Sequence, residues 1–156
     1  MIARIETIDQ IKPTFREYLN YMSQFFDIKD RRSWCEGALK YLQRYSTEED
    51  RHIYILKESE TIIGFAFINK HFRFNHDGFA VAEFYIKKDH ERKGFGRKLA
   101  EHVFAQFYGN WEVAVSLQNS SAREFWRRVV STYTAGNFVE KRTCLFSGYG
   151  FLFNNA

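Results

Sequence analysis

A short basic segment between a predicted strand and a predicted helix carries the residues best suited to chemistry. It reads Lys-Lys-Asp-His-Glu-Arg-Lys-Gly-Phe-Gly-Arg-Lys over residues 87–98, with Gly94 and Gly96 one residue apart. Glycine allows unusual backbone dihedrals and a close approach of a ligand. The first amides of a helix have no partner within the helix, and the positive end of the helix dipole lies beside them, so the segment predicts an anion site. Four cations in it could donate charge-assisted hydrogen bonds to a pyrophosphate: Arg92, Lys93, Arg97 and Lys98.

Two familiar phosphate-binding loops do not fit this segment. A dinucleotide fingerprint needs a third glycine where Leu99 stands, and a P-loop needs Gly-Lys-Ser/Thr where Gly96-Arg97-Lys98 stands. Short glycine motifs are weak signals, so the segment alone leaves a simpler alternative open. In that alternative the glycines only form a turn and the basic side chains are solvated.

The hydrophobic pattern sets this segment within an alternation of helices and strands. Apolar residues recur every three or four positions over 11–26 and again over 34–45, which predicts two helices. The segments 52–57 and 62–69 are rich in Ile, Phe and Tyr and are joined by Glu-Ser-Glu-Thr, which indicates a hairpin. The remaining predicted elements are a strand over 79–87, a helix over 99–107 that stops at Gly109-Asn110, a strand over 111–117, a helix over 122–130 and an aromatic, strand-like tail over 143–153.

Composition and charge limit the class of protein. With 156 residues, 45% hydrophobic and 27% charged, we expect one soluble domain over residues 1–156. The N-terminus has no signal-peptide pattern and no run approaches about 18 apolar residues, so we expect a cytoplasmic protein without a membrane partner. Cys35 and Cys144 are too few for a disulfide framework. The net charge of +4 suits a small polyanion as well as RNA, but the basic residues cluster at one turn without an RNA-binding signature, so we expect no nucleic-acid partner.

Two motifs resemble the GNAT superfamily of N-acetyltransferases. Residues 86–100, which contain the basic segment, are similar to motif A of that family, Gln/Arg-x-x-Gly-x-Gly/Ala. Some twenty residues later, Asn119-Ser-Ser-Ala-Arg-Glu-Phe-Trp126 resembles motif B, an Asn, then Ala three residues on, then an aromatic pair. The stretches 82–85, 111–115 and 125–129 are most similar to a bacterial subgroup of predicted acetyltransferases. The resemblance implies an α/β fold with a mixed, largely antiparallel central sheet, splayed strands and flanking helices.

The resemblance also implies that acetyl-CoA binds as co-substrate. In the family the pantetheine arm lies between the splayed strands, so the backbone of Phe84, Tyr85 and Ile86 would bond the pantetheine and the acetyl carbonyl. Asn119 would bond the pantetheine, and Trp126 would lie near the sulfur. The pyrophosphate would be held by the loop amides and basic side chains of Arg92, Lys93, Gly94, Phe95, Gly96, Arg97 and Lys98.

The acceptor implied by the family is an amine, and an amine needs a base. At neutral pH it is mostly ammonium and must lose a proton before or during attack on the thioester. Glu83, just before the pantetheine-binding backbone, is the candidate base, acting directly or through water. The alternative is a structural carboxylate paired with a neighbouring Lys or Arg.

Two positions depart from the family pattern. Glu91 stands where motif A usually has Gln or Arg, and because a carboxylate would repel phosphate we expect Glu91 to point away from it. Trp126 stands where the family often has a Tyr acid, and indole donates no proton at a useful pKa. A thiol pKa of about 8.5 makes unaided departure of the thiolate only mildly unfavourable. The Trp126 departure keeps a second hypothesis open, a non-catalytic acyl-CoA-binding regulatory domain.

The sequence does not identify the acceptor, which we expect to be a small-molecule amine or a peptide amine. Tyr18, Tyr21 and Phe26 on the first helix are candidates to line the acceptor site, although a buried aromatic face explains them more simply. His52 is a further candidate, and because the histidines show no metal-ligand spacing we predict no metal site. The aromatic tail suggests a homodimer.

Overall fold

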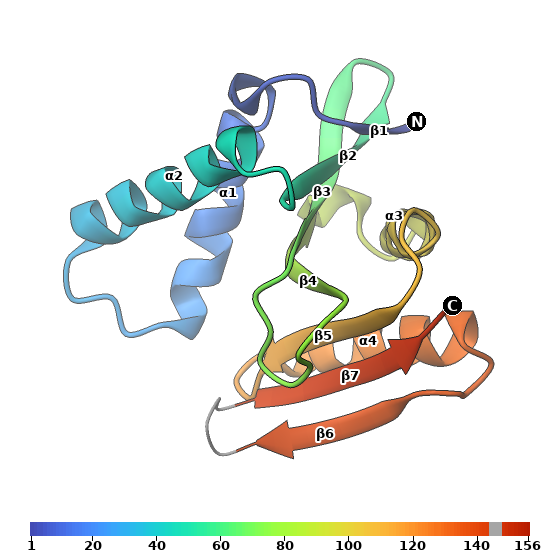
Figure 1. Ribbon diagram of the computed structural model, residues 1–156. Coiled ribbons are helices and arrows are strands. Elements are labelled where there is room, and N and C mark those ends of the chain that lie inside the picture. Colours follow the sequence, from blue (N-terminus) through green and yellow to red (C-terminus); the bar gives the residue numbers. More distant parts are fainter. Residues whose placement is uncertain (144–147) are drawn as a thin grey trace.

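The computed structural model describes residues 1–143 and 148–156 and is built on a seven-stranded sheet of order β1-β2-β3-β4-β5-β7-β6 (Figure 1). Neighbouring strands are antiparallel except β4 and β5, which are parallel. This confirms the predicted α/β fold with a mixed, largely antiparallel sheet. The strands are β1 (Ile2–Arg4), β2 (His52–Glu58), β3 (Thr61–Asn69), β4 (Phe79–Ile86), β5 (Asn110–Ser116), β6 (Val139–Thr143) and β7 (Gly148–Asn154).

Helices cover both faces of the sheet (Figure 1). On one face lie α1 (Lys12–Met22) and α2 (Arg31–Thr47), and on the other lie α3 (Phe95–Phe104) and α4 (Ser120–Tyr133). Three short 3-10 turns complete the described elements: η1 (Ile8–Gln10), η2 (Ser23–Phe25) and η3 (Lys88–His90). None of the helices in the described part of the chain is both long and apolar enough to cross a bilayer.

Alternation of side chains along the strands produces two hydrophobic cores, one under each helix pair. Under α1 and α2, Phe15 stacks on Phe67 with ring centroids 5.5 Å apart. Under α3 and α4, Phe104 packs edge-on against Trp111 at 5.0 Å. Burying one such side chain contributes about 1.5–3 kcal/mol. Each core buries many of them, and together they hold the sheet that carries the site described below.

The two central strands separate part-way along their length. β4 pairs with β3 as far as Ile86 but pairs with β5 only through Phe79–Val81. The register of β4 shifts where Phe67 faces Glu83 and Ile68 faces Val81, which leaves Ala82 as an extra residue. Because such a bulge bends its strand, the rest of β4 leaves β5 and the sheet opens. The splayed strands expected from the sequence are thus present.

The structure adds elements that the hydrophobic pattern did not predict. β1 has only three residues, too few to show a period, and β6 reads Val-Glu-Lys-Arg-Thr, in which charges hide the strand pattern. α3 begins at Phe95, four residues before the predicted start. The predicted tail strand is found over Gly148–Asn154, whereas its residues 144–147, with Cys144, lie outside the described residues.

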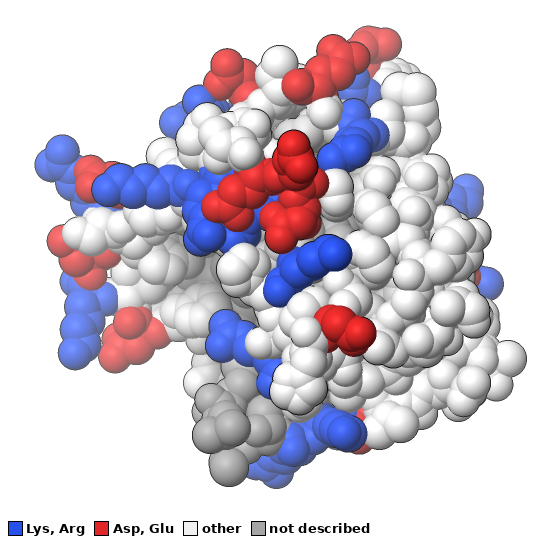
Figure 2. Space-filling model, viewed as in Figure 1, with Lys and Arg blue, Asp and Glu red and all other residues white. Residues whose placement is uncertain are grey.

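Charged side chains of both signs are interspersed on the face seen in Figure 2. They gather mainly on the side of the α1–α2 pair, and acidic and basic groups lie close together there. The formal charge of +4 therefore does not appear on this face as one continuous basic surface.

Candidate active site

A cavity of about 910 Å³ occupies the opening between β4 and β5. Residues 81–86 of β4 and 113–116 of β5 line it, together with the loop before α3, the start of α4 and the end of α1. Its volume lies within the range of about 300–1,000 Å³ that is usual for small-molecule sites. The opening of the sheet has therefore produced a ligand-sized cavity.

One edge of β4 faces this cavity with its backbone. The amide of Lys87 donates to the carbonyl of Ile63 on β3 at 2.8 Å. Because successive amides of a strand point to alternate edges, those of Ile86 and Phe84 point away from β3, toward the side that β5 has left. The structure brings all three predicted backbone-binding residues, Phe84, Tyr85 and Ile86, to the cavity wall.

The glycine loop turns sharply into α3. Arg92 and Gly94 have φ angles of 60° and 84°, in the left-handed region that suits glycine. Gly94 is the N-cap of α3 and no side chain caps the helix, so the amides of the first turn are free to bind an anion. Gly94 and Gly96 both line the cavity.

Gly96 serves a different purpose from the one its motif suggests. It lies inside the first turn of α3, and a Cβ added to it would lie 3.0 Å from two ring atoms of Phe125 on α4. The missing side chain thus allows α3 and α4 to approach each other. Gly96 does not adopt an unusual backbone dihedral.

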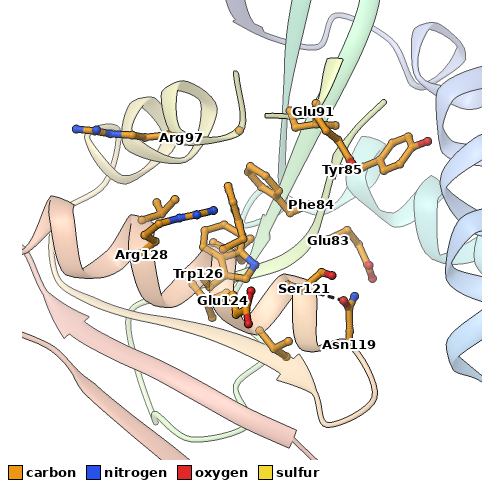
Figure 3. A pocket seen from close by; sticks show the side chains of 18 of the residues that line it. Glu83, Phe84, Tyr85, Glu91, Arg97, Asn119, Ser121, Glu124, Trp126 and Arg128 are labelled. Carbon is orange, nitrogen blue, oxygen red and sulfur yellow. Dashed lines mark hydrogen bonds between the residues drawn. The ribbon is translucent and has the colours of Figure 1, made fainter. Parts of the chain in front are cut away.

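The predicted basic residues are only partly brought to the cavity. Arg92 and Arg97 line it, whereas Lys93 and Lys98 are exposed and do not. Arg97 pairs through Nε with Oε1 of Glu101 at 2.6 Å, and its side chain runs along α3 away from the cavity (Figure 3). Phe95 packs against the core under α3.

Arg128 was missed by the sequence analysis. It lies on α4, lines the cavity and extends toward it beneath α3 (Figure 3). Arg128 lies two residues after Trp126 on α4, which puts it near the cavity in the fold. In the sequence alone it looks like any exposed arginine on a helix.

Glu91 lies on the side of the tyrosines. Burial raises the pKa of Tyr21, and the negative charge of Glu91 raises it further. Burial also raises the pKa of Tyr85, and the negative charges of Glu17 and Glu91 raise it further. Figure 3 shows Glu91 beside Tyr85, and Glu91 also lines the cavity.

Glu83 projects toward α1 and α2 and is held by neutral donors. The hydroxyl of Tyr18 donates to Oε2 of Glu83, and the hydroxyl of Tyr41 lies nearby. Burial raises the pKa of Glu83 to about 7, although both tyrosine hydroxyls act to lower it. No lysine or arginine of the described chain forms an ion pair with Glu83. The structural alternative of a carboxylate neutralised by a cation is therefore wrong.

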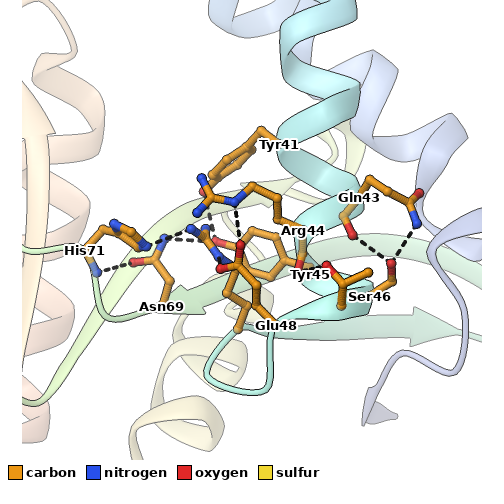
Figure 4. A network of polar contacts seen from close by, with 10 residues as sticks. Tyr41, Gln43, Arg44, Tyr45, Ser46, Glu48, Asn69 and His71 are labelled. Atoms are coloured by element: carbon orange, nitrogen blue, oxygen red, sulfur yellow. Dashed lines mark hydrogen bonds and ion pairs between the residues drawn. The ribbon is translucent and has the colours of Figure 1, made fainter.

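A polar network holds the second of these tyrosines (Figure 4). The Tyr41 and Tyr45 hydroxyls lie 2.9 Å apart, and Nδ2 of Asn69 donates to the Tyr45 hydroxyl at 3.0 Å. The guanidinium of Arg51, a residue only 3% exposed, lies over both rings at 5.8 and 5.2 Å. Its Nη2 lies 2.7 Å from Nε2 of His71. These residues are far from Glu83 in sequence and follow no known motif, so the sequence analysis missed them.

The two residues predicted from motif B line the cavity as well. Asn119 is the N-cap of α4, where its Oδ1 accepts from the amide of Ala122 at 3.1 Å, and its side chain is also hydrogen bonded to Tyr21. Trp126 is buried and packs edge-on against Phe84 with ring centroids 4.7 Å apart. Its ring therefore forms apolar wall beside the open edge of β4.

The aromatic and histidine candidates divide between the cavity and the rest of the fold. Tyr18 and Tyr21 line the cavity, whereas Phe26 does not and packs against Trp34 at 6.5 Å. His52 lies away from the cavity, stacked on Phe107 with centroids 4.9 Å apart.

Solved structures share this fold across nearly the whole chain. An acetyltransferase from Thermus thermophilus aligns with a TM-score of 0.74 at 14% identity, covering 99% of this chain and 97% of that one. PaiA N-acetyltransferase from Thermoplasma acidophilum, in complex with coenzyme A, gives 0.65 at 16% identity and 99% of each chain. The yncA structure from Salmonella typhimurium, with its cofactor acetyl-CoA, gives 0.66 at 12% identity, covering 99% and 92%.

Sequence comparison supplies the family. No curated protein matches the sequence. The family model described as "Acetyltransferase (GNAT) family" matches residues 15–130, a span that holds the open strand edge, the glycine loop and both motifs. The chain therefore belongs to the GNAT family of acetyltransferases.

Proposed function

We propose that the protein is an N-acetyltransferase that moves the acetyl group of acetyl-CoA to a primary amine by direct attack on the thioester. The observation that carries the proposal is Glu83, a carboxylate without a cationic partner that lines the same cavity as the open edge of β4 and the free amides of α3. A base and an anion site thus share one cavity. The coenzyme A and acetyl-CoA bound to structures of the same fold support the choice of co-substrate.

The residues of the cavity fit acetyl-CoA. Its diphosphate would lie against the free first-turn amides of α3, with Arg92 and Arg128 as cationic side chains of the same cavity wall. Its pantetheine amides would pair with the backbone of Phe84 and Ile86, which faces the opening left by β5. Trp126 would supply apolar surface near the sulfur.

Glu83 would act as the general base. A carboxyl whose pKa is raised to about 7 by burial is half deprotonated at neutral pH and accepts a proton far better than an ordinary carboxylate. It would take one proton from the incoming ammonium and return it to solvent. Tyr18 and Tyr41 would keep the carboxylate oriented during that transfer.

The group transfer then balances without a further reagent. The amine nitrogen attacks the thioester carbonyl carbon, the C–N bond forms, and the C–S bond breaks. A backbone amide on the open edge of β4 would stabilise the negative charge that develops on the carbonyl oxygen. The nitrogen loses its second proton as the amide forms, and the departing thiolate takes up one proton. Because Trp126 provides no acid, we infer that the thiolate leaves unaided.

A second candidate is a non-catalytic acyl-CoA-binding regulatory domain. The observation that favours it is the indole of Trp126 at the place where the family often has a tyrosine acid. This candidate shares the cofactor site with the first and lacks only turnover.

Two measurements separate these possibilities. Acetyl-CoA at one hundred times its dissociation constant stabilises a binding-competent fold by about 2.7 kcal/mol, which raises the melting temperature of a domain of this size by roughly 5–10 °C. Absence of a shift at millimolar acetyl-CoA or CoA would refute both candidates. A panel of small and peptide amines, with release of free thiol as the readout, then decides between them. Binding without turnover on any amine leaves the regulatory domain.

A further inference from the structure

A row of aromatic rings leads outward from Glu83 along one wall of the cavity. Tyr18, which is hydrogen bonded to Glu83, lies 5.6 Å from Tyr85 between ring centroids. Tyr85 lies 6.0 Å from Tyr21, and Tyr21 lies 5.5 Å from Phe25. All four rings line the cavity. The row is open to solvent at the ring before Phe25, Tyr21, which is 37% exposed.

Carboxylates lie along this row, and the nearby Lys87 is already paired with one of them, Glu17, at 3.3 Å. Glu83 stands at its inner end, and Glu91 lies near Tyr21 and Tyr85. The cationic residues that line the described cavity are Arg92 in the loop before α3, Arg97 on α3 and Arg128 on α4. α3 and α4 pack on the face of the sheet opposite to α1, so Arg97 and Arg128 belong to the other side of the cavity.

We propose that this row is the acceptor site and that it takes a primary amine with an aromatic body and no carboxylate, an arylalkylamine. The inference rests on the function proposed above. An ammonium held at Glu83 would face the rings of the neighbouring tyrosines, which attract cations. The aromatic body would pack along Tyr85, Tyr21 and Phe25, where ring pairs add to the gain from burial.

The same wall disfavours amino acids. An α-amino acid placed with its nitrogen at Glu83 would bring its own carboxylate beside that side chain, where no lysine or arginine of the described chain forms an ion pair. Burying an unpaired charge is costly. An aliphatic diamine is also a poorer fit, because the carboxylates that its second ammonium could meet (Glu17, Glu91 and Glu124) are all exposed, and it would leave the rings uncovered.

Matched substrates test the proposal directly. The kcat/KM for phenethylamine should exceed that for L-phenylalanine by about 30-fold or more, which corresponds to about 2 kcal/mol. L-phenylalanine methyl ester, in which the charge is masked, should recover most of the difference. Equal use of phenethylamine and phenylalanine would overturn the proposal, as would a preference for 1,4-diaminobutane over phenethylamine.

Three variants assign the preference to the aromatic row. Tyr21→Leu should raise the KM for phenethylamine about tenfold, which corresponds to about 1.4 kcal/mol. The KM for acetyl-CoA should stay unchanged. Tyr21→Phe keeps the ring and should keep the preference for phenethylamine. Phe26→Leu is the control, because Phe26 is on the same segment and 52% exposed but does not line the cavity. If Tyr21→Leu behaves like Phe26→Leu, the row is not the acceptor site.

Failure of this proposal is distinguishable from failure of the proposed function. Acetylation of other amine classes, without the preference described, keeps the N-acetyltransferase and overturns the arylalkylamine. A protein that binds acetyl-CoA but acetylates no amine of a broad panel overturns both.

Discussion

Replacing Glu83 by Gln should make the protein more stable at alkaline pH while it loses activity. The raised pKa means that folding favours the protonated carboxyl, so the stabilising contribution of Glu83 is fully present below its usual pKa of 4.5. It is lost as the pH rises through the folded-state value of about 7. Gln has nearly the same shape as Glu and does not titrate, so the stability of the variant should not fall over this pH range.

The size of the effect follows from the shift. A move from 4.5 to about 7 corresponds to about 3 kcal/mol at pH values above 7. The hydrogen bond from Tyr18 is already contained in the folded-state pKa of about 7, so it offsets nothing further. Because about a quarter of this change is complete at pH 5, we expect the free energy of unfolding of Glu83→Gln, relative to the parent, to rise by about 2.5 kcal/mol between pH 5 and pH 8.5.

Urea unfolding of both proteins at several pH values measures this difference. Glu60→Gln, in the exposed turn between β2 and β3, is the control and should show no such pH dependence. Turnover at pH 7 should fall about 10²–10⁴-fold in Glu83→Gln, the usual effect of removing a positioned base, with acetyl-CoA affinity kept. Higher pH should partly rescue the variant, because more of the acceptor then arrives deprotonated. A stability difference that is constant with pH would contradict the environment assigned to Glu83, and unchanged turnover would remove it from the mechanism.

Three further predictions concern the rest of the site. Tyr18→Phe removes a hydrogen bond that favours the Glu83 carboxylate, so the rising limb of the rate–pH profile should move about 0.5–1 unit to higher pH; an unmoved midpoint would exclude this role. Gly96→Asp should weaken CoA binding at least tenfold and also lower the melting temperature, because its Cβ meets Phe125; binding and stability equal to the parent would show that the loop is only a turn. Arg128→Ala should cost about 1–3 kcal/mol of CoA affinity in titration calorimetry, more than the same change at Arg97, whose guanidinium is held by Glu101. The opposite order would mean that Arg97 turns to the ligand on binding.

Local features of this protein were predictable from sequence, and long-range ones were not. The glycine loop follows from residue types at fixed spacing, and the β2–β3 hairpin from its period and turn. The bulge at Ala82 leaves no mark on the sequence, because it depends on which residue of β3 each residue of β4 faces. The partners of Glu83 come from two helices far away in the sequence, and only the tertiary packing reveals them. For this reason the sequence indicated Glu83 as a candidate base but left open what holds it.

Among the residues that the structure describes, tyrosines and no cations contact Glu83, and this choice of partners has a consequence for its pKa. A lysine or arginine in contact would stabilise the carboxylate and lower its pKa, which would make it a poor base near neutral pH. Tyrosine hydroxyls orient the carboxylate at a smaller cost in basicity, and burial together with the nearby carboxylate raises the pKa of Tyr18, so this hydroxyl stays protonated and can donate. The buried cation of the region, Arg51, lies one layer further back, where it packs on the rings of Tyr41 and Tyr45. The network therefore fixes the geometry of the Glu83 carboxylate and keeps positive charge out of contact with it.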